Sequence, residues 1–171
     1  IMAEARELLM IHSLSRAKEL EEKSQRDGLT GARNRIYFDE TLRREFHLSA
    51  QYKLPLTIAI IDLDHFKQVN DTHGHLAGDS LLVTVVSTIY EQIRQDDTLS
   101  RYGGEEFALI LPGTTLAASR NLITRLKDAI AAINYKLDGH FVIRITASIG
   151  VASNEPGVAH FNEPLDMIKA A

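Results

Sequence analysis

The chain has 171 residues, of which 44% are hydrophobic, a length and composition that suit one domain with an appended segment. It contains no cysteine, so disulfides, cysteine-ligated zinc and thiol nucleophiles are all excluded. A net charge of -4 and a pI near 6.0 argue against broad, non-specific binding of nucleic acids.

Residues 1–26 are predicted to form a polar helix without Pro or Gly. Met10, Ser13, Ala17 and Leu20 follow a heptad-like spacing, but the pattern is short and has a Ser in the seam, so a coiled coil and a solvated linker both stay open. No apolar run approaches the roughly 18 residues of a membrane span, and the charged N-terminus differs from a signal peptide. We expect a cytoplasmic domain that contacts membranes only through other parts of a longer protein.

Residues 27–171 are predicted to form one domain of alternating strands and helices. The expected elements are a helix from Asn34, a strand at 56–61, a helix at 75–94, strands at 98–102 and 105–111, a helix capped by Thr114 or Thr115, a strand at 141–152 and a last helical turn. The helix from Asn34 is expected to bury Ile36, Phe38, Leu42 and Phe46.

The order β-α-β-β-α-β, with extra helices in front, is the ferredoxin-like layout of the α+β class. It consists of an antiparallel sheet with two helices on one face. In this topology the first strand lies beside the third. Asp62, at the end of the first strand, is therefore expected to lie near Glu105, at the start of the third.

The stretch 101–107, Arg-Tyr-Gly-Gly-Glu-Glu-Phe, lies between two of the predicted strands. A Gly-Gly pair there predicts a tight hairpin turn, because Gly103 and Gly104 can both take a positive φ without steric cost. The pleat of the returning strand should send the carboxylates of Glu105 and Glu106 to opposite faces. Taken alone, this pattern also suits a solvated hairpin tip.

The segment 62–64, Asp-Leu-Asp, places carboxylates at the end of the central strand. Carboxylates that meet at the edge of a sheet are costly unless a cation lies between them. We therefore predict a Mg²⁺ or Mn²⁺ site formed by Asp62 and Glu105 with a backbone carbonyl and waters. A calcium EF-hand is excluded, because positions six and twelve of that loop are Lys67 and His73 rather than Gly and Glu.

The residues that follow suit a guanine nucleotide. Free backbone N–H groups at His65, Phe66 and Lys67, where a strand turns into a helix, suit phosphate oxygens. Asn70 and Asp79 offer acceptors for the N1–H and N2–H₂ groups of guanine, which adenine lacks. As an alternative, Phe66 is a core residue and the Asn and Asp serve in turns and helix caps.

Together these segments resemble the signature of GGDEF-domain diguanylate cyclases, in the GGEEF form, from about Asp27 to the end of the chain. The first motif differs from the usual pattern at Ala32, where Leu is common. The resemblance rests on motifs in the family's order and spacing at 27–30 with 34–35, 62–71, 74–79, 101–107 and 148–152.

The resemblance implies an enzyme that condenses two GTP molecules into cyclic di-GMP with loss of two pyrophosphates. Asp62 and Glu105 would hold two Mg²⁺ ions with help from the Leu63 carbonyl, and Glu106 is the second acidic residue of the motif. The Gly-Gly pair would let the nucleotide approach closely. Since one domain holds one GTP, catalysis is expected to need a homodimer in which two domains face each other.

Residues 94–97, Arg-Gln-Asp-Asp, resemble the RxxD product-inhibition site of the family. Arg94 and Asp97 would bind cyclic di-GMP, with Arg125 as a second arginine, although Arg94 could instead interact only with a helix C-terminus. The sequence stops at Ala171, within the family's final helix, so we expect weaker GTP binding than in a longer domain. The alternatives are a non-catalytic cyclic di-GMP receptor, a structural dimerisation module, and a cyclase that uses ATP.

Overall fold

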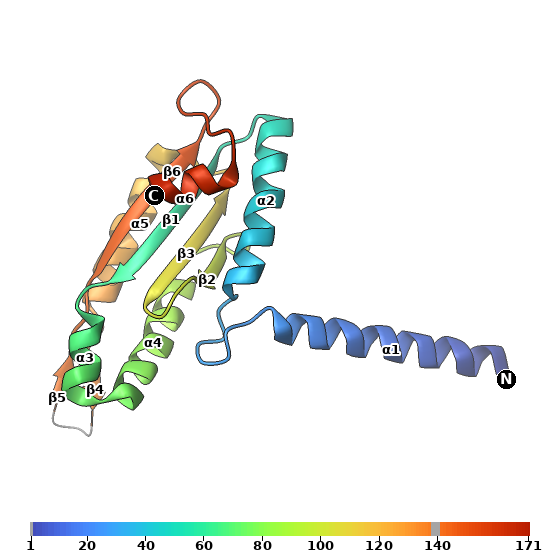
Figure 1. Cartoon of the computed structure of the whole chain (residues 1–171), viewed down its shortest axis with the longest axis horizontal. Coiled ribbons are helices and arrows are strands. Elements are labelled where there is room, and N and C mark those ends of the chain that lie inside the picture. The colour runs from blue at the N-terminus through green and yellow to red at the C-terminus, as the bar shows by residue number, and fades with distance from the viewer. Residues whose placement is uncertain (1, 138–140) are drawn as a thin grey trace.

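The centre of the molecule is an antiparallel sheet with strand order β2-β3-β1-β6 (Figure 1). The computed structural model describes residues 2–137 and 141–171. Its strands are β1 (Leu56–Leu63), β2 (Thr98–Arg101), β3 (Glu106–Pro112), β4 (Tyr135–Leu137), β5 (Phe141–Ile143) and β6 (Ala147–Asn154). Its helices are α1 (Met2–Ser24), α2 (Arg35–Tyr52), α3 (Phe66–His73), α4 (His75–Tyr90), α5 (Leu116–Ala131) and α6 (Pro164–Ala170).

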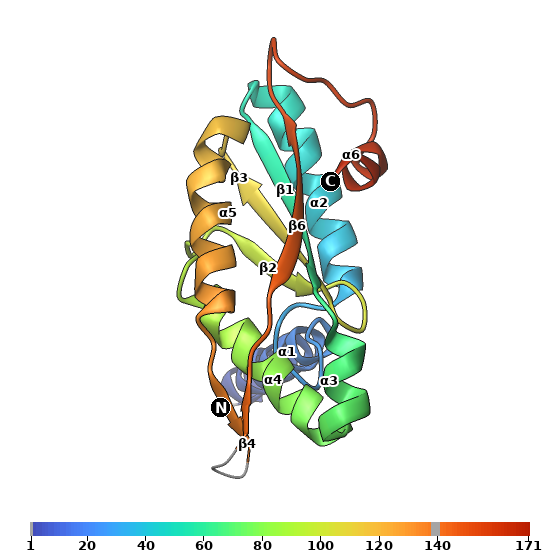
Figure 2. The same ribbon diagram turned by 90° about the vertical axis from the view of Figure 1, so that its left-hand side faces the viewer.

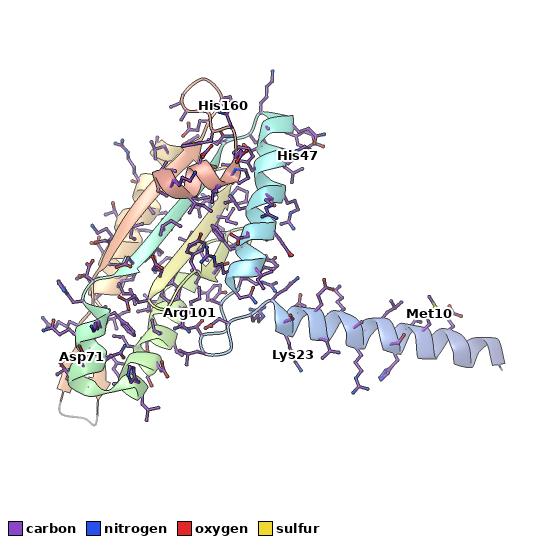
Figure 3. All side chains as sticks on the ribbon, viewed as in Figure 1. Met10, Lys23, His47, Asp71, Arg101 and His160 are labelled. Atoms are coloured by element: carbon purple, nitrogen blue, oxygen red, sulfur yellow. The ribbon has the colours of Figure 1, made fainter. Side chains whose placement is uncertain are left out.

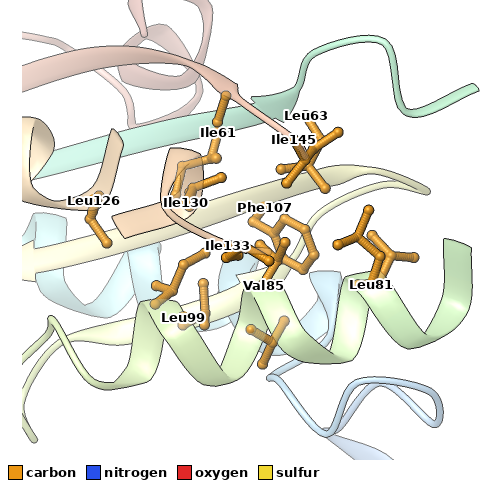
Figure 4. Close-up of a cluster of buried hydrophobic side chains, with 14 of the residues drawn as sticks. Ile61, Leu63, Leu81, Val85, Leu99, Phe107, Leu126, Ile130, Ile133 and Ile145 are labelled. Carbon is orange, nitrogen blue, oxygen red and sulfur yellow. The ribbon is translucent and has the colours of Figure 1, made fainter. Parts of the chain in front are cut away.

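Helices cover both faces of this sheet (Figure 2). In β1, Ala59, Ile61 and Leu63 contribute to the core formed with α4 and α5, part of which Figure 4 shows. Leu56 and Ile58 contribute to a second core with α2 and α6. The predicted α+β fold with β1 beside β3 is confirmed, and the nearly continuous apolar run of β1 is explained by burial on both sides.

Helix α2 buries Phe38 and Leu42 as predicted, but the prediction was wrong for Ile36, which is 68% exposed. Ile36 precedes Phe38 by two positions, so the two side chains point to roughly opposite sides of the helix. The side chain of Asn34 caps α2 by accepting a hydrogen bond of 3.0 Å from the N–H of Tyr37.

The predicted helix at 75–94 is too long, since α4 ends at Tyr90. The reason lies in residues 94–97, where the Asp97 carboxylate accepts the Arg94 N–H at 2.8 Å and the Asp97 N–H donates to the Arg94 carbonyl at 3.1 Å. These local bonds favour a turn over a continued helix.

The predicted strand at 141–152 is in fact two strands in two sheets. β5 pairs with β4, which the sequence did not predict, and β6 pairs with β1. Burial alternates without interruption through Ile143, Ile145 and Ala147, so the sequence pattern does not reveal the break.

Helix α1 extends away from the rest of the molecule, and its Met10 and Leu20 are exposed (Figures 1 and 3). Its pairing with a second copy stays a prediction. No helix in the described ranges, α1 included, is both long and apolar enough to cross a membrane.

The loop between α1 and α2 is fixed to the edge of the sheet. The Arg33 N–H donates to the Leu99 carbonyl at 3.1 Å, and the Arg101 N–H donates to the Arg33 carbonyl at 2.8 Å. In the same loop, Asp27 accepts hydrogen bonds from Thr30 and forms an ion pair of 3.1 Å with Arg101. Burial raises the pKa of Asp27, but the Thr30 hydrogen bonds and the Arg101 charge lower it further, so it lies below its ordinary value.

We expect Asp27→Asn to lower the free energy of unfolding by about 1–2 kcal/mol, because it removes a charged partner from Arg101 in a half-buried site. The pKa of Asp27 is lower in the folded than in the unfolded chain, so its stabilisation is complete above the unfolded value near 3.8 and declines as the pH falls further. Urea unfolding at several pH values measures this. Asp128→Asn, on α5, is the control, and a stability difference that does not decline in acid would contradict the assignment.

Candidate functional site

The adjacent ends of β1 and β3 bring the predicted carboxylates to one edge of the sheet. In the antiparallel register, Asp62 pairs with Glu106, and the Leu63 N–H donates to the Glu105 carbonyl at 3.4 Å. Directly paired residues share a face of a sheet. The cross-strand neighbour of Asp62 is therefore Glu106, which the sequence analysis had treated only as the second acidic residue of its motif.

The hairpin tip differs from the predicted turn, since neither Gly103 nor Gly104 has a positive φ. The reversal spans more than two residues, so the two-residue turn that requires positive φ does not form. Instead, the N–H groups of Tyr102 and Gly103 both donate to the Glu106 carbonyl, at 2.8 and 3.1 Å. The Arg101 guanidinium donates to the Gly104 carbonyl at 2.7 and 3.2 Å.

The two glycines differ in what surrounds them. A Cβ on Gly103 would collide with the Glu106 carboxylate, which lies over it, whereas a Cβ on Gly104 would meet no atom within 4 Å. A side chain at position 103 would therefore displace the Glu106 carboxylate from its place over the hairpin. The open space at Gly104 leaves room for a molecule to approach the backbone.

The carboxylates fit a hard cation only in part. Within the described residues, no group of three or more His, Cys, Asp or Glu side chains is placed to hold a metal ion. Mg²⁺ is commonly bound by one or two carboxylates together with substrate phosphates and waters, so the lack of a third carboxylate does not count against a Mg²⁺ or Mn²⁺ site at this edge.

Asp64 has a different role from Asp62. Its carboxylate accepts hydrogen bonds from the Thr146 hydroxyl at 2.6 Å and the Ser148 hydroxyl at 2.7 Å. These bonds hold the pKa of Asp64 below its ordinary value. Asp64 thus joins the end of β1 to the start of β6.

Helix α3 begins directly after these carboxylates. His65 precedes it in a left-handed conformation with φ 58°, and the side chains of His65 and Lys67 are exposed. The side chain of Phe66 is 4% exposed and belongs to the core, so its predicted role in substrate binding rests on its backbone alone. The first N–H groups of a helix have no partner within the helix, which is the kind of backbone that suits phosphate oxygens.

Asn70 on α3 and Asp79 on α4 are half-buried. Neither side chain forms a hydrogen bond with another of the described residues, so the polar groups of both are available to a ligand. The helices that carry them are joined by Gly74, whose φ of 83° allows the sharp change of direction.

The three residues of the predicted inhibitory site lie together. Arg94, Asp97 and Arg125 line one pocket between the end of α4 and α5, and Arg125 donates to the Gln92 carbonyl at 2.9 Å. Burial raises the pKa of Asp97 above its ordinary value, against the opposing effect of the Arg94 N–H and charge. Two guanidinium groups and one carboxylate can recognise phosphate and the edge of a guanine.

Sequence reasoning assigned no role to Asp27, Gly78 or the Arg101 side chain. A signal was present for Asp27 and Arg101, since both belong to recognised motifs and have opposite charge. The importance of Gly78 depends on which side chain of another helix lies against it, and no pattern along the chain contains that information.

Known proteins resemble this chain over most of its length. The family model described as "Diguanylate cyclase, GGDEF domain" matches residues 24–171. The diguanylate cyclase DgcP of Pseudomonas aeruginosa is 39% identical over 150 residues, which are 86% of this chain and 22% of DgcP. The probable diguanylate cyclase DgcC of Escherichia coli is 34% identical over 146 residues, which are 85% of this chain and 39% of DgcC. The chain thus spans well under half the length of these curated relatives.

Solved structures agree with the fold. The coiled coil and GGDEF domain of DgcB from Caulobacter crescentus, crystallised with c-di-GMP, has a TM-score of 0.83 and 27% identity, covering 99% of this chain and 90% of that one. The diguanylate cyclase SiaD of Pseudomonas aeruginosa, crystallised with its activator SiaC, has a TM-score of 0.80 and 35% identity, covering 96% and 62% of the two chains. On its sequence and its fold, the chain belongs to the GGDEF domain family of diguanylate cyclases.

Proposed function

We propose that this chain is a catalytic domain that condenses two GTP molecules into cyclic di-GMP and two pyrophosphates. The observation that carries the proposal is the pairing of Asp62 with Glu106 at one edge of the sheet, where the backbone of Glu105 also bonds to Leu63, just before α3. A receptor for cyclic di-GMP has no need of carboxylates at this edge. The names of DgcP and DgcC support the same activity, and a cytoplasmic location, where GTP is available, is part of the proposal.

In the reaction, the ribose 3′-oxygen of one GTP attacks the α-phosphorus of the other. The bond between that α-phosphorus and the oxygen bridging to the β-phosphorus breaks, and pyrophosphate leaves. Asp62, Glu105 and the Leu63 carbonyl would hold Mg²⁺ or Mn²⁺, which when bound neutralises phosphate charge and favours in-line attack. The backbone N–H groups at residues 65–67 bind the triphosphate. Asn70 and Asp79 bind guanine. With adenine, which lacks the N1–H and N2–H₂ donors, the acceptor oxygens of these two residues stay unpaired.

Both bonds of the cyclic product form between two GTP molecules, and each domain binds one. Two domains must therefore meet with their hairpins facing each other, so the reaction needs a homodimer. The long helix α1 is suited to raise the effective concentration of one domain near another, because it extends away from the body and exposes Met10 and Leu20.

The pocket of Arg94, Asp97 and Arg125 is proposed to bind cyclic di-GMP as a feedback inhibitor. Its guanidinium groups bind phosphate with paired N–H groups, and the Asp97 carboxylate accepts from guanine. Product bound there would restrain the approach of the second domain.

Incubation of the chain with GTP and Mg²⁺ is expected to yield cyclic di-GMP and pyrophosphate, and Glu105→Gln to lower kcat by about a hundredfold or more, because the amide keeps the shape but loses the charge. Chromatography of the products measures both. Glu40→Gln, on the exposed side of α2, is the matched control. Turnover that Glu105→Gln leaves unchanged would refute the metal assignment, and tight product binding without turnover would favour a receptor.

The activity per molecule is expected to fall as the protein is diluted, because the encounter of two domains becomes rarer. A dilution series of the GTP assay, with the oligomeric state followed by sedimentation, measures this. Constant activity per molecule in a sample shown to be monomeric would be incompatible with catalysis across two domains.

Arg94→Ala is expected to weaken cyclic di-GMP binding by about tenfold or more, because one paired phosphate contact is lost, while initial turnover stays unchanged. Calorimetric titration with cyclic di-GMP measures the binding. Arg120→Ala, on α5 but outside this pocket, serves as the control. Equal affinity of Arg94→Ala and the unchanged chain would exclude this pocket as the product site.

A further inference from the structure

Gly78 lies on α4 at the point where the side chain of Asn70 reaches across from α3. A Cβ built on Gly78 would collide with the Asn70 Oδ1, and it would lie 3.0 Å from the Asn70 Cγ and 3.1 Å from the Phe66 Cζ. Gly78 has an ordinary helical conformation without positive φ, so its backbone does not require glycine. The need for glycine therefore comes from the Asn70 amide.

The backbone of Asn70 is held in place. Its carbonyl accepts the Gly74 N–H at 2.8 Å, and the Gly74 carbonyl accepts the Gly78 N–H at 3.3 Å. These bonds tie the end of α3 to the first turn of α4. Below the amide, Phe66 is part of the core and resists displacement. A Cβ at position 78 would thus displace mainly the Asn70 side chain, because it can change its rotamer more easily than the packed Phe66 ring can move.

We infer that Gly78 is a positioning residue for guanine recognition, because its missing side chain leaves the space on α4 that the Asn70 amide occupies. The inference rests on the proposed function, in which Asn70 and Asp79 bind the base. Asp79 is the next residue on α4, so the Asn70 amide lies against the helical turn that carries Asp79. Neither side chain has a partner among the described residues, which leaves both free for one ligand.

Gly78→Ala tests the inference. The affinity for a fluorescent GTP with a blocked ribose, which binds without reacting, is expected to fall about tenfold in the presence of Mg²⁺, and the preference over the matching ATP probe is expected to shrink. The melting temperature is measured alongside to show that the variant is folded in the assay, because the closeness of Phe66 opposes the higher helix propensity of alanine. Ser80→Ala, on the exposed side of α4, controls for helix propensity and should leave the affinity unchanged.

A double-mutant cycle with Asn70→Ala separates positioning from a general structural effect. Asn70→Ala removes the colliding atoms, so Gly78→Ala should cost no further affinity in that background. An equal loss in both backgrounds, or no loss in either, would overturn the inference. If the unchanged chain does not bind the GTP probe, the proposed function fails as well. If Asn70→Ala weakens binding and Gly78→Ala does not, the positioning inference alone fails.

Discussion

The Arg101 guanidinium holds the hairpin on which the candidate site depends. It donates two hydrogen bonds to the Gly104 carbonyl and pairs with the Asp27 carboxylate, so the tip of one hairpin is fixed to the loop that follows α1. A Lys at this position would supply the charge without the planar array of donors that meets two acceptors together. The orientation of Glu105 and Glu106 relative to β1 depends on this side chain.

The register between β1 and β3 is the second constraint. Asp62 lies opposite Glu106 because Ile61 lies opposite Phe107 and Ile60 opposite Ala108. A slip by one residue would move Asp62 to the other face and expose Phe107, which is fully buried. The free energy that holds the carboxylates together thus comes from the apolar core between the sheet and α4 and α5, since burial of large aromatic and aliphatic side chains fixes the register.

The sequence predicts most of this arrangement because its strongest signals concern burial. The apolar run of β1 and the helical period of α4 indicate a central strand and a covering helix, and their order brings Asp62 near Glu105. The errors have local causes. The Asp97 carboxylate accepts the N–H of Arg94, three residues earlier in the chain, and so favours a turn where a longer α4 was predicted. The alternation of burial through Ile145 hides the boundary between β5 and β6. The φ angles of Gly103 and Gly104 depend on how many residues form the turn between β2 and β3. The Gly-Gly pair alone does not reveal that number.

The loop after α1 connects the parts of the molecule that the proposed function needs to coordinate. Asn34 donates from its amide to the Ser24 carbonyl at the end of α1 and also caps α2. The preceding residue, Arg33, forms backbone hydrogen bonds with Leu99 and Arg101 of β2, and β2 leads into the hairpin. The loop that is bonded to the end of α1 is therefore the same loop that is bonded to Arg101. The pocket lined by Arg94 and Asp97 adjoins the other end of β2, because Asp97 directly precedes that strand. The same short strand thus lies between α1, the hairpin and the proposed feedback site.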